Sequence, residues 1–423
     1  MKTWLTSLRV YGDRRMLAIL LMGFASGLPL ALTGATLSIW LRQSGISLTA
    51  IGLFAQAGLS YNLKFLWAPA MDRVSLPFLT ARFGRRRGWA LLIQALLALA
   101  ILAMGLSDPV DHPARTALCA VIVAFLSASQ DIVIDAYRVE LLKPDEQGAG
   151  AASTQIGYRL GMLASGAGAL YLAQYLGWSQ AYAVMAGLVV LGMIVILATR
   201  EPHRVDAPSG AWLADAVVAP FRDFILRSSW LWVLLFVVLY KFGDALAGVM
   251  SGPFYVDLGF ALTEIAAVSK VFGVAASITG VFLGGVAVYR WGLMRALFLC
   301  GGMQMLSNLM YIAQLWAGHD VTMLAASIAV ENVTGGMASA AFVAYLSSLC
   351  SPAYTATQYA LLSALAAVPR TFLASLGGFF ADKLGWTNFF MFSTAACLPS
   401  LLLLLWLMRS ADPHQPRTVA IEP

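Results

Sequence analysis

Long apolar runs alternate with short polar segments along almost the whole chain. Most runs are about 20 residues long, which lets an α-helix cross the roughly 30 Å hydrocarbon core of a bilayer. The first run is long enough to span and has no small-residue cleavage site before it, so we expect a retained helix rather than a signal peptide. The pattern predicts an all-α integral membrane protein with twelve transmembrane helices, at residues 16–40, 49–71, 88–106, 117–140, 150–175, 181–199, 230–256, 262–288, 295–316, 321–347, 358–381 and 388–409.

A polar stretch at residues 200–229 divides these runs into six and six. It contains proline, serine and glycine before a short amphipathic segment at residues 212–226. We therefore expect an N-terminal six-helix bundle (1–199), a cytoplasmic linker with an amphipathic helix (200–229), and a C-terminal six-helix bundle with a short cytoplasmic tail (230–423).

The two halves resemble each other in sequence. Four short matches occur in the same order: Ala31-Leu32-Thr33-Gly34 with Ala245-Leu246-Ala247-Gly248, Leu48-Thr49-Ala50-Ile51 with Leu262-Thr263-Glu264-Ile265, Leu163-Ala164-Ser165 with Leu373-Ala374-Ser375, and Leu-Gly-Trp at 176–178 and 384–386. Their common order indicates a duplicated six-helix unit. Two pseudo-symmetric six-helix bundles around a central cavity are the architecture of major facilitator transporters.

Composition agrees with a membrane protein, because 60% of the residues are hydrophobic and only 11% are charged, against roughly 25% charged in soluble domains. The net charge of +6 comes from basic residues in alternate loops, and only Arg42, Arg115 and Lys383 fall on the other side. The positive-inside rule then predicts that both termini are cytoplasmic. A basic chain of this kind needs no nucleic-acid partner.

The loop after the second predicted span resembles a gating motif of major facilitator transporters, an Asp-Arg followed by Gly and basic residues. Here the motif residues are Asp72, Arg73, Gly84, Arg85 and Arg86, with about ten extra residues between its two parts. The second half echoes the motif more weakly, with a tyrosine where the acid would be. We expect this loop to latch the halves and gate movement. The alternative is an ordinary basic cytoplasmic loop.

Ionisable residues inside the predicted spans are the candidate functional groups, because such residues are costly in lipid and usually face a bundle interior or a wet cavity. Basic side chains suit an anionic substrate, which arginine can bind through two parallel hydrogen bonds. Neighbouring hydroxyl and amide groups can bind a polyhydroxylated or amide-rich ligand. The predicted substrate-binding residues are Lys64, Arg159, Lys241 and Arg370, with Tyr61, Asn62, Gln130, Tyr158 and Asn332.

Buried carboxylates can couple transport to a proton gradient, since their protonation changes with access to water. The predicted proton-coupling residues are Asp131, Asp135, Asp244 and Glu331. Purely structural alternatives remain for the charged residues. Lys64 and Asp131 lie at similar depth and can form an inter-helix bridge, and Lys241 and Asp244, three residues apart, can neutralise each other on one helix face.

Several segments together resemble the AmpG muropeptide permeases: Gly23-Phe24-Ala25-Ser26-Gly27-Leu28-Pro29, Lys64-Phe65-Leu66-Trp67-Ala68-Pro69, Ser129-Gln130-Asp131-Ile132-Val133-Ile134-Asp135-Ala136-Tyr137 and Gly157-Tyr158-Arg159-Leu160-Gly161-Met162-Leu163. The resemblance is dense through the first five spans and thinner around Lys241-Phe242-Gly243-Asp244.

The resemblance implies a permease of the bacterial inner membrane that imports cell-wall turnover products, N-acetylglucosaminyl-1,6-anhydro-N-acetylmuramyl peptides. It also implies peptidoglycan recycling and β-lactamase induction. The expected partners are this small glycopeptide, protons and the lipid bilayer. We expect a monomer that uses the proton gradient and no cofactor.

Two alternatives to a muropeptide permease remain open, and a third, an enzyme, is disfavoured. The acetyl-CoA transporter family shares the Lys-x-Leu-Trp-Ala-Pro and Ser-Gln-Asp-Ile segments, and a sensor could bind muropeptide without moving it. An enzyme is disfavoured because the histidines occur singly in predicted loops or the tail, at His112, His203, His319 and His414, with no nucleophile and base pair. The cysteines Cys119, Cys300, Cys350 and Cys397 have no metal-like spacing, so we expect packing residues and neither a metal site nor a disulfide framework.

Overall fold

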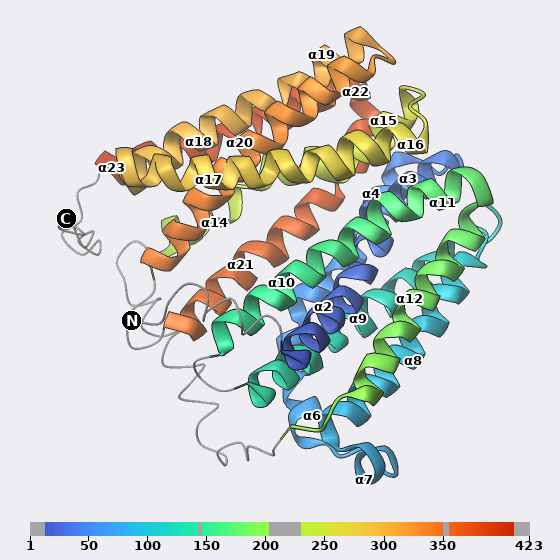
Figure 1. The fold of residues 1–423 in the computed structure, drawn as a ribbon. Coiled ribbons are helices and arrows are strands. Elements are labelled where there is room, and N and C mark those ends of the chain that lie inside the picture. Colours follow the sequence, from blue (N-terminus) through green and yellow to red (C-terminus); the bar gives the residue numbers. More distant parts are fainter. Residues whose placement is uncertain (1–12, 143–145, 203–229, 350–354, 410–423) are drawn as a thin grey trace. The chain divides into compact units, whose positions relative to one another are not determined.

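The computed structural model describes residues 13–142, 146–202, 230–349 and 355–409. Over these residues the chain is helical and has no β-strand, which confirms the predicted all-α fold class (Figure 1). The amphipathic helix expected in the linker lies outside the described residues. The chain forms two compact units: unit 1 is Met1–Ile46, Phe54–Ala207 and Ala261–Ala266, and unit 2 is Ser47–Leu53, Pro208–Phe260 and Ala267–Pro423.

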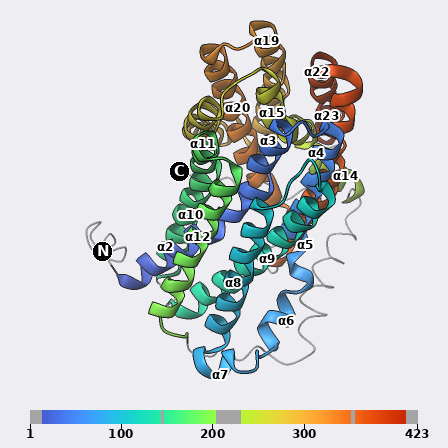
Figure 2. The same ribbon diagram turned by 90° about the vertical axis from the view of Figure 1, so that its right-hand side faces the viewer.

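Unit 1 contains most of the first six predicted spans. Its elements are α2 (Arg14–Thr33), α3 (Ala35–Gln43), the 3₁₀ segment η2 (Ala55–Gly58), α5 (Leu59–Leu63), η3 (Lys64–Leu66), α6 (Ala68–Arg73), α7 (Leu79–Phe83), α8 (Arg85–Gly105), α9 (Pro113–Leu141), α10 (Gln147–Leu163), the π segment η4 (Ala164–Gly168), α11 (Ala169–Leu176), α12 (Trp178–Ala198) and α16 (Leu262–Ile265). Helices α8, α9 and α12 are neighbours (Figures 1 and 2). Part of the core lies among them, around Ile93, Val133 and Tyr137.

Unit 2 contains the remaining spans. Its elements are α4 (Leu48–Phe54), α14 (Trp230–Leu239), α15 (Phe242–Asp257), the π segment η5 (Ala266–Phe272), α17 (Gly273–Trp291), α18 (Leu293–Ser307), α19 (Leu309–Ala317), α20 (Val321–Ser348), α21 (Thr355–Ser375), α22 (Gly377–Ala395) and α23 (Leu398–Arg409). Gly385, at φ 71°, interrupts α22 between the eleventh and twelfth predicted spans. The core is aromatic, and the rings of Tyr240 and Phe342 stack with centroids 5.2 Å apart.

Nine helical segments in the described part of the chain are long and apolar enough to cross a membrane. The second, fifth and eleventh predicted spans are helical but not among them. The second span is broken at η3, because Pro69 lacks the N–H that would bond the carbonyl of residue 65. The eighth span contains a π segment around Lys270. Such irregular turns inside helices are frequent at functional sites.

Glycines allow α2 and α10 to pack at backbone distance. A Cβ atom added to Gly157 or Gly161 of α10 would overlap a backbone carbonyl oxygen of α2. Gly23 and Gly27 of α2 press against the backbone of α10 in the same way. The small-residue packing expected for membrane helices therefore fixes which face of each helix meets the other.

The duplication seen in the sequence recurs in backbone geometry. Three pairs of glycines at corresponding positions all have positive φ: Gly45 and Gly259, Gly84 and Gly292, Gly177 and Gly385. The tryptophan that follows the last pair of glycines donates the same type of hydrogen bond in each half. Trp178 donates its indole N–H to Gln43 at 2.8 Å, and Trp386 donates to Asp257 at 3.0 Å.

Two equivalent helix starts each belong to the unit that contains most of the other half of the chain. Leu48–Ile51 belongs to unit 2, where the Thr49 amide and hydroxyl donate to Asp382 at 2.7 and 2.5 Å. Leu262–Ile265 belongs to unit 1, where the Leu262 amide donates to Gln174 at 3.2 Å. Each acceptor satisfies an amide at a helix start that has no intrahelical partner. Gln174 and Asp382 lie four residues before the two equivalent tryptophans, so they are themselves equivalent.

Candidate functional site

Asp131 on α9 is at the centre of a polar cluster in unit 1. It is buried, and its Oδ2 lies 3.6 Å from the Nζ of Lys64, whose side chain is 36% exposed. The hydroxyl of Ser26 donates a hydrogen bond to its Oδ1. The structure therefore brings together the pair that the sequence placed at matching depth. Lys64 sits where the second span changes from α-helix to 3₁₀.

Other predicted substrate-binding residues of the first half lie on α5, α9 and α10. Tyr61 and Asn62 lie on α5 beside Lys64, and both are partly buried. Tyr158 on α10 is also partly buried and interacts electrostatically with Asp131. Gln130 is wholly buried, and its amide oxygen and nitrogen have no hydrogen-bond partner among the described residues. Since a buried amide is costly to leave unpaired, this one is suited to bind water or a ligand.

Asp135 occupies a different environment one turn along α9. Its side chain is 54% exposed and lies 3.6 Å from Arg138. The two carboxylates that share a helix face in the sequence thus divide into a buried one and an exposed, locally paired one.

Arg159 is exposed and makes no ion pair with a carboxylate in the described part of the chain. It lies between Gly157 and Gly161 on α10, and at 100° per residue its side chain points away from the face that those glycines press against α2. The Arg159 side chain is therefore not part of the α2–α10 contact.

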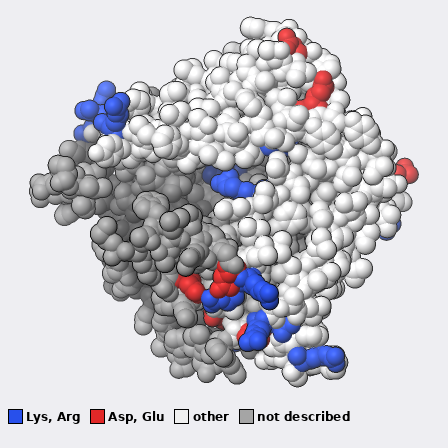
Figure 3. All heavy atoms as spheres, viewed as in Figure 1, with Lys and Arg blue, Asp and Glu red and all other residues white. Residues whose placement is uncertain are grey.

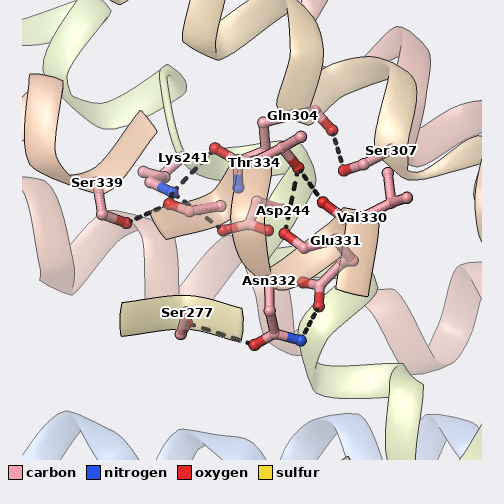
Figure 4. A network of polar contacts seen from close by, with 11 residues as sticks. Lys241, Asp244, Ser277, Gln304, Ser307, Val330, Glu331, Asn332, Thr334 and Ser339 are labelled. Atoms are coloured by element: carbon pink, nitrogen blue, oxygen red, sulfur yellow. Dashed lines mark hydrogen bonds and ion pairs between the residues drawn. The ribbon is translucent and has the colours of Figure 1, made fainter. Parts of the chain in front are cut away.

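Unit 2 has its own polar network (Figure 4). Lys241 is buried and directs its Nζ to three acceptors: Gln304 Oε1 at 2.9 Å, the Gly335 carbonyl at 3.2 Å and Asp244 Oδ2 at 3.5 Å. A lysine ammonium has three donors, so all of them are occupied. Lys241 is thus held within its own unit, and its predicted function in substrate binding stays a prediction.

Glu331 and Asn332 lie on α20 in the same network (Figure 4). Asn332 Nδ2 donates to Glu331 Oε2 at 2.8 Å, and Asn332 Oδ1 accepts from Ser277 at 3.4 Å. Lys270, in the π segment, is partly buried and interacts electrostatically with Glu331. Asn332 is therefore engaged within its own unit, although a ligand could displace the long bond from Ser277.

Arg370 lies on α21 directly after Pro369 and is partly buried. No carboxylate among the described residues lies within ion-pair distance of its guanidinium. Asp244 still acts on it electrostatically. In lacking a carboxylate within ion-pair distance among the described residues, Arg370 resembles Arg159 of unit 1.

The motif loop is bound to helix ends of unit 1. Arg86 holds Glu140 with its shortest contact at 2.6 Å, and Arg87 donates to the Ile196 and Leu197 carbonyls at the end of α12. Arg85 also lies 3.9 Å from Glu140. These contacts join α8 to α9 and α12.

Glu201 completes this junction from the residues that follow α12. Its carboxylate accepts the amides of Arg86 and Arg87 at 2.8 and 3.0 Å, where a helix N-terminus favours negative charge. A side chain on Gly84, at φ 88°, would overlap Glu201. Sequence reasoning missed Glu140 and Glu201, although both are acids at predicted helix ends. The side chains of Asp72 and Arg73 lie outside the described structure, so their predicted gating function stays a prediction.

Acidic and basic side chains gather at this end of unit 1, in the lower part of the view (Figure 3). Arg15 lies 2.6 Å from Asp13 and 2.9 Å from Glu146. The hydrogen bonds from Arg15 hold the pKa of Asp13 below its ordinary value. These exposed pairs position helix ends and contribute little to stability. In the described residues no group of His, Cys, Asp and Glu is arranged to hold a metal ion.

The sequence matches the family model of the Major Facilitator Superfamily over residues 19–317 and 242–423. Among solved structures, the fold resembles a bacterial homolog to the human lysosomal transporter Spinster, with a TM-score of 0.71, 15% identity and coverage of 94% of this chain and 97% of that one. It also resembles the peptide transporter POT in complex with alafosfalin, with a TM-score of 0.71, 14% identity and 94% of each chain covered. The fold and family define a membrane transporter of the major facilitator class.

Closer relatives narrow this class. The chain is 45% identical over 400 residues to the anhydromuropeptide permease of Escherichia coli (strain K12), covering 94% of this chain and 80% of that protein. It is 35% identical over 409 residues to the putative transporter AmpG 4 of Rickettsia conorii (strain ATCC VR-613 / Malish 7), covering 94% and 98%. The chain belongs to the AmpG family of permeases.

Proposed function

We propose that this chain imports N-acetylglucosaminyl-1,6-anhydro-N-acetylmuramyl peptides from periplasm to cytoplasm across the bacterial inner membrane, by proton symport with alternating access. The observation that carries the proposal is the 45% identity, over 94% of this chain, to a protein named anhydromuropeptide permease. Both termini are then cytoplasmic, and the working form is a monomer.

Arg159 and Arg370 are the proposed substrate anchors. Both lie in membrane spans and neither has a carboxylate partner among the described residues. The peptide part of the substrate carries carboxylates, which a guanidinium can bind through two parallel hydrogen bonds. The unpaired amide of Gln130 can serve a sugar hydroxyl or N-acetyl group.

Asp131 and Glu331 are the proposed proton carriers, one in each unit. Asp131 is enclosed by Ser26 and Lys64, and Glu331 bonds to Asn332. A carboxylate held inside a helix bundle changes the local charge when it gains or loses a proton, which links its occupancy to that of a nearby anion. Asp135 is more than half exposed and paired with Arg138, so it lacks this property.

The test is accumulation of labelled anhydromuropeptide in proteoliposomes with an inward proton gradient. We expect accumulation to stop when the gradient is collapsed. Asp131→Asn and Glu331→Gln should lose gradient-driven accumulation but keep exchange of internal for external substrate, whereas Asp135→Asn, the matched control, should keep both. Arg159→Ala and Arg370→Ala should require higher substrate concentrations.

Other outcomes would contradict parts of the proposal. Accumulation that survives collapse of the gradient would exclude proton symport. Normal transport by both arginine variants would exclude them as anchors. Uptake of acetyl-CoA in place of muropeptide would favour the related transporter family, and binding without uptake would favour a sensor.

A further inference from the structure

The connection between α6 and α8 presents apolar side chains outward next to the membrane-spanning helices. Val74 follows the last residue of α6 directly, and α8 is one of the apolar spans. Phe78 is 75% exposed and Val74 is 49% exposed. Leaving a phenyl ring in water forfeits the free energy of burying it. These residues belong to the extra stretch that separates the two parts of the loop motif.

Phe78 reaches this position through a strained backbone. Its φ and ψ are 68° and −53°, and it is the one non-glycine residue of the described chain with positive φ. The Leu79 amide donates to the Pro77 carbonyl at 2.8 Å, which closes a γ-turn of the rare, strained type. A bulky residue adopts this conformation only where the surrounding structure imposes it.

The surrounding contacts make this segment a fixed structure. The Trp89 indole donates to the Val74 carbonyl at 2.9 Å, and the Leu76 amide donates to the Thr80 hydroxyl at 2.9 Å. Gly88 of α8 leaves room for the backbone of α7, since a Cβ atom there would lie 3.2 Å from the Leu79 carbonyl carbon. The turn is therefore held against α8 with the Phe78 ring directed outward.

The charge of the connection between α6 and α8 is positive, with no acidic residue. The sequence has no aspartate or glutamate from Arg73 to Ser107. Arg86 and Arg87 are occupied by Glu140 and by carbonyls of α12. Arg82 is exposed, and its guanidinium carbon lies 5.7 Å from the centroid of the Phe83 ring. It has no carboxylate partner among the described residues.

We propose that residues 74–83 form a lipid-docking segment, in which the Phe78 ring inserts into the interfacial region of the bilayer and Arg82 binds the phosphate of an anionic lipid headgroup. An aromatic ring is favoured at the headgroup level, and a cation beside it gains from anionic lipid. Helix α6, the last part of the second predicted span, ends at Arg73, and the apolar span α8 begins at Arg85, so the segment cannot lie far from the interface. The free energy gained when the Phe78 ring inserts into the bilayer then offsets the conformational cost of the strained turn.

The position of residue 78 can be measured with a nitroxide spin label. Phe78→Cys is labelled in a transport-competent variant without native cysteines, in nanodiscs that contain phosphatidylglycerol. Asp111→Cys, in the exposed loop between α8 and α9, is the control. We expect the ratio of collisions with oxygen to collisions with a water-soluble nickel complex to be several-fold higher at 78. Equal ratios would place the ring in water, and a label reached by neither agent would mean that protein covers it. Either result overturns the proposal.

A second measurement leaves the native cysteines in place. Native mass spectrometry compares phosphatidylglycerol with phosphatidylcholine bound to the wild type, to Arg82→Gln and to Arg14→Gln. The last variant removes an exposed arginine at the start of α2. We expect Arg82→Gln to lose about fivefold in affinity for phosphatidylglycerol, the effect of one cation near an anionic leaflet, and Arg14→Gln to lose less. Equal losses would indicate non-specific attraction and overturn the assignment.

Phe78→Gly separates lipid docking from folding. Glycine adopts positive φ without a steric penalty. The melting temperature of the Phe78→Gly variant in detergent should therefore not fall below that of the wild type. Phosphatidylglycerol binding should nevertheless weaken. Unchanged lipid binding would exclude the ring from docking.

Discussion

Lys64 and Lys241 are both lysines in membrane spans, but they differ in burial and in the number of their partners. The Lys64 side chain is 36% exposed and faces one carboxylate at 3.6 Å. The Lys241 side chain is 9% exposed, and its three donors all have acceptors. A buried ammonium is stable only when its donors are paired. The number of free donors therefore decides whether a membrane lysine can bind a ligand.

Replacing Lys241 with methionine should destabilise the protein more than removing the pair. Lys241→Met leaves Asp244 without its counter-ion and Gln304 without its donor, which should lower the free energy of unfolding by about 1–3 kcal/mol. Adding Asp244→Asn should recover part of this loss. Thermal unfolding in detergent of both single variants and the double variant measures the coupling. A double variant whose loss equals the sum of the single losses would show that the two groups are not coupled.

At the element scale, the positions of glycines determine which faces of α2 and α10 pack together in unit 1. Four glycines face this contact, and each leaves space that the other helix's backbone fills. Apolar side chains gain little by leaving lipid for another helix, so close backbone packing must supply much of the association. The same contact orients Arg159 away from α2.

Gly161→Ala should therefore disturb the α2–α10 contact. The added methyl group would overlap the backbone of Phe24, and such overpacking should cost about 1–3 kcal/mol. Gly168→Ala is the matched control, because it lies in the same span with nothing within 4 Å of the added atom. The melting temperature in detergent should fall for the first variant and stay level or rise for the second. Equal melting temperatures would contradict close packing at Gly161.

The whole chain retains the duplication in features that its sequence shows only weakly. Equivalent glycines turn the backbone, equivalent tryptophans bond to equivalent residues, and Gln174 and Asp382 each bond to a helix start of the other half. Gln174 is neutral and Asp382 is charged, so the two equivalent caps have diverged in chemistry while keeping the same acceptor geometry.

The orientation of the chain can be tested directly. The basic loops predict that Ser75 is cytoplasmic and Lys383 periplasmic, and both side chains are exposed. In a cysteine-free background, Lys383→Cys should react with a membrane-impermeant thiol reagent added to cells whose outer membrane has been permeabilised. Ser75→Cys should react only in inverted inner-membrane vesicles. The reverse pattern would overturn the predicted cytoplasmic location of both termini.

The fold class follows from the amino-acid pattern, since runs of apolar residues as long as a bilayer is thick leave few alternatives to a helical bundle. The sequence also marked candidate functional residues, because a charge in an apolar run is costly in lipid. Its short repeated motifs revealed the duplication, and its family resemblance was confirmed by the relatives.

Burial of the charged groups and their full sets of partners could be read from the packed helices alone. Side-chain spacing placed Asp131 and Asp135 on one face of a helix, but packing against Ser26 and Lys64 buried one and left the other exposed. The spacing of Lys241 and Asp244 predicted their pairing, but the other two acceptors of Lys241, Gln304 and the Gly335 carbonyl, come from α18 and α20, far away in sequence. The strained turn at Phe78 is equally invisible in the sequence, because it depends on the contacts that α8 makes with the loop. Sequence patterns could suggest single pairs such as Lys64 with Asp131, but the burial of each group and its further partners depend on elements that are distant in the chain.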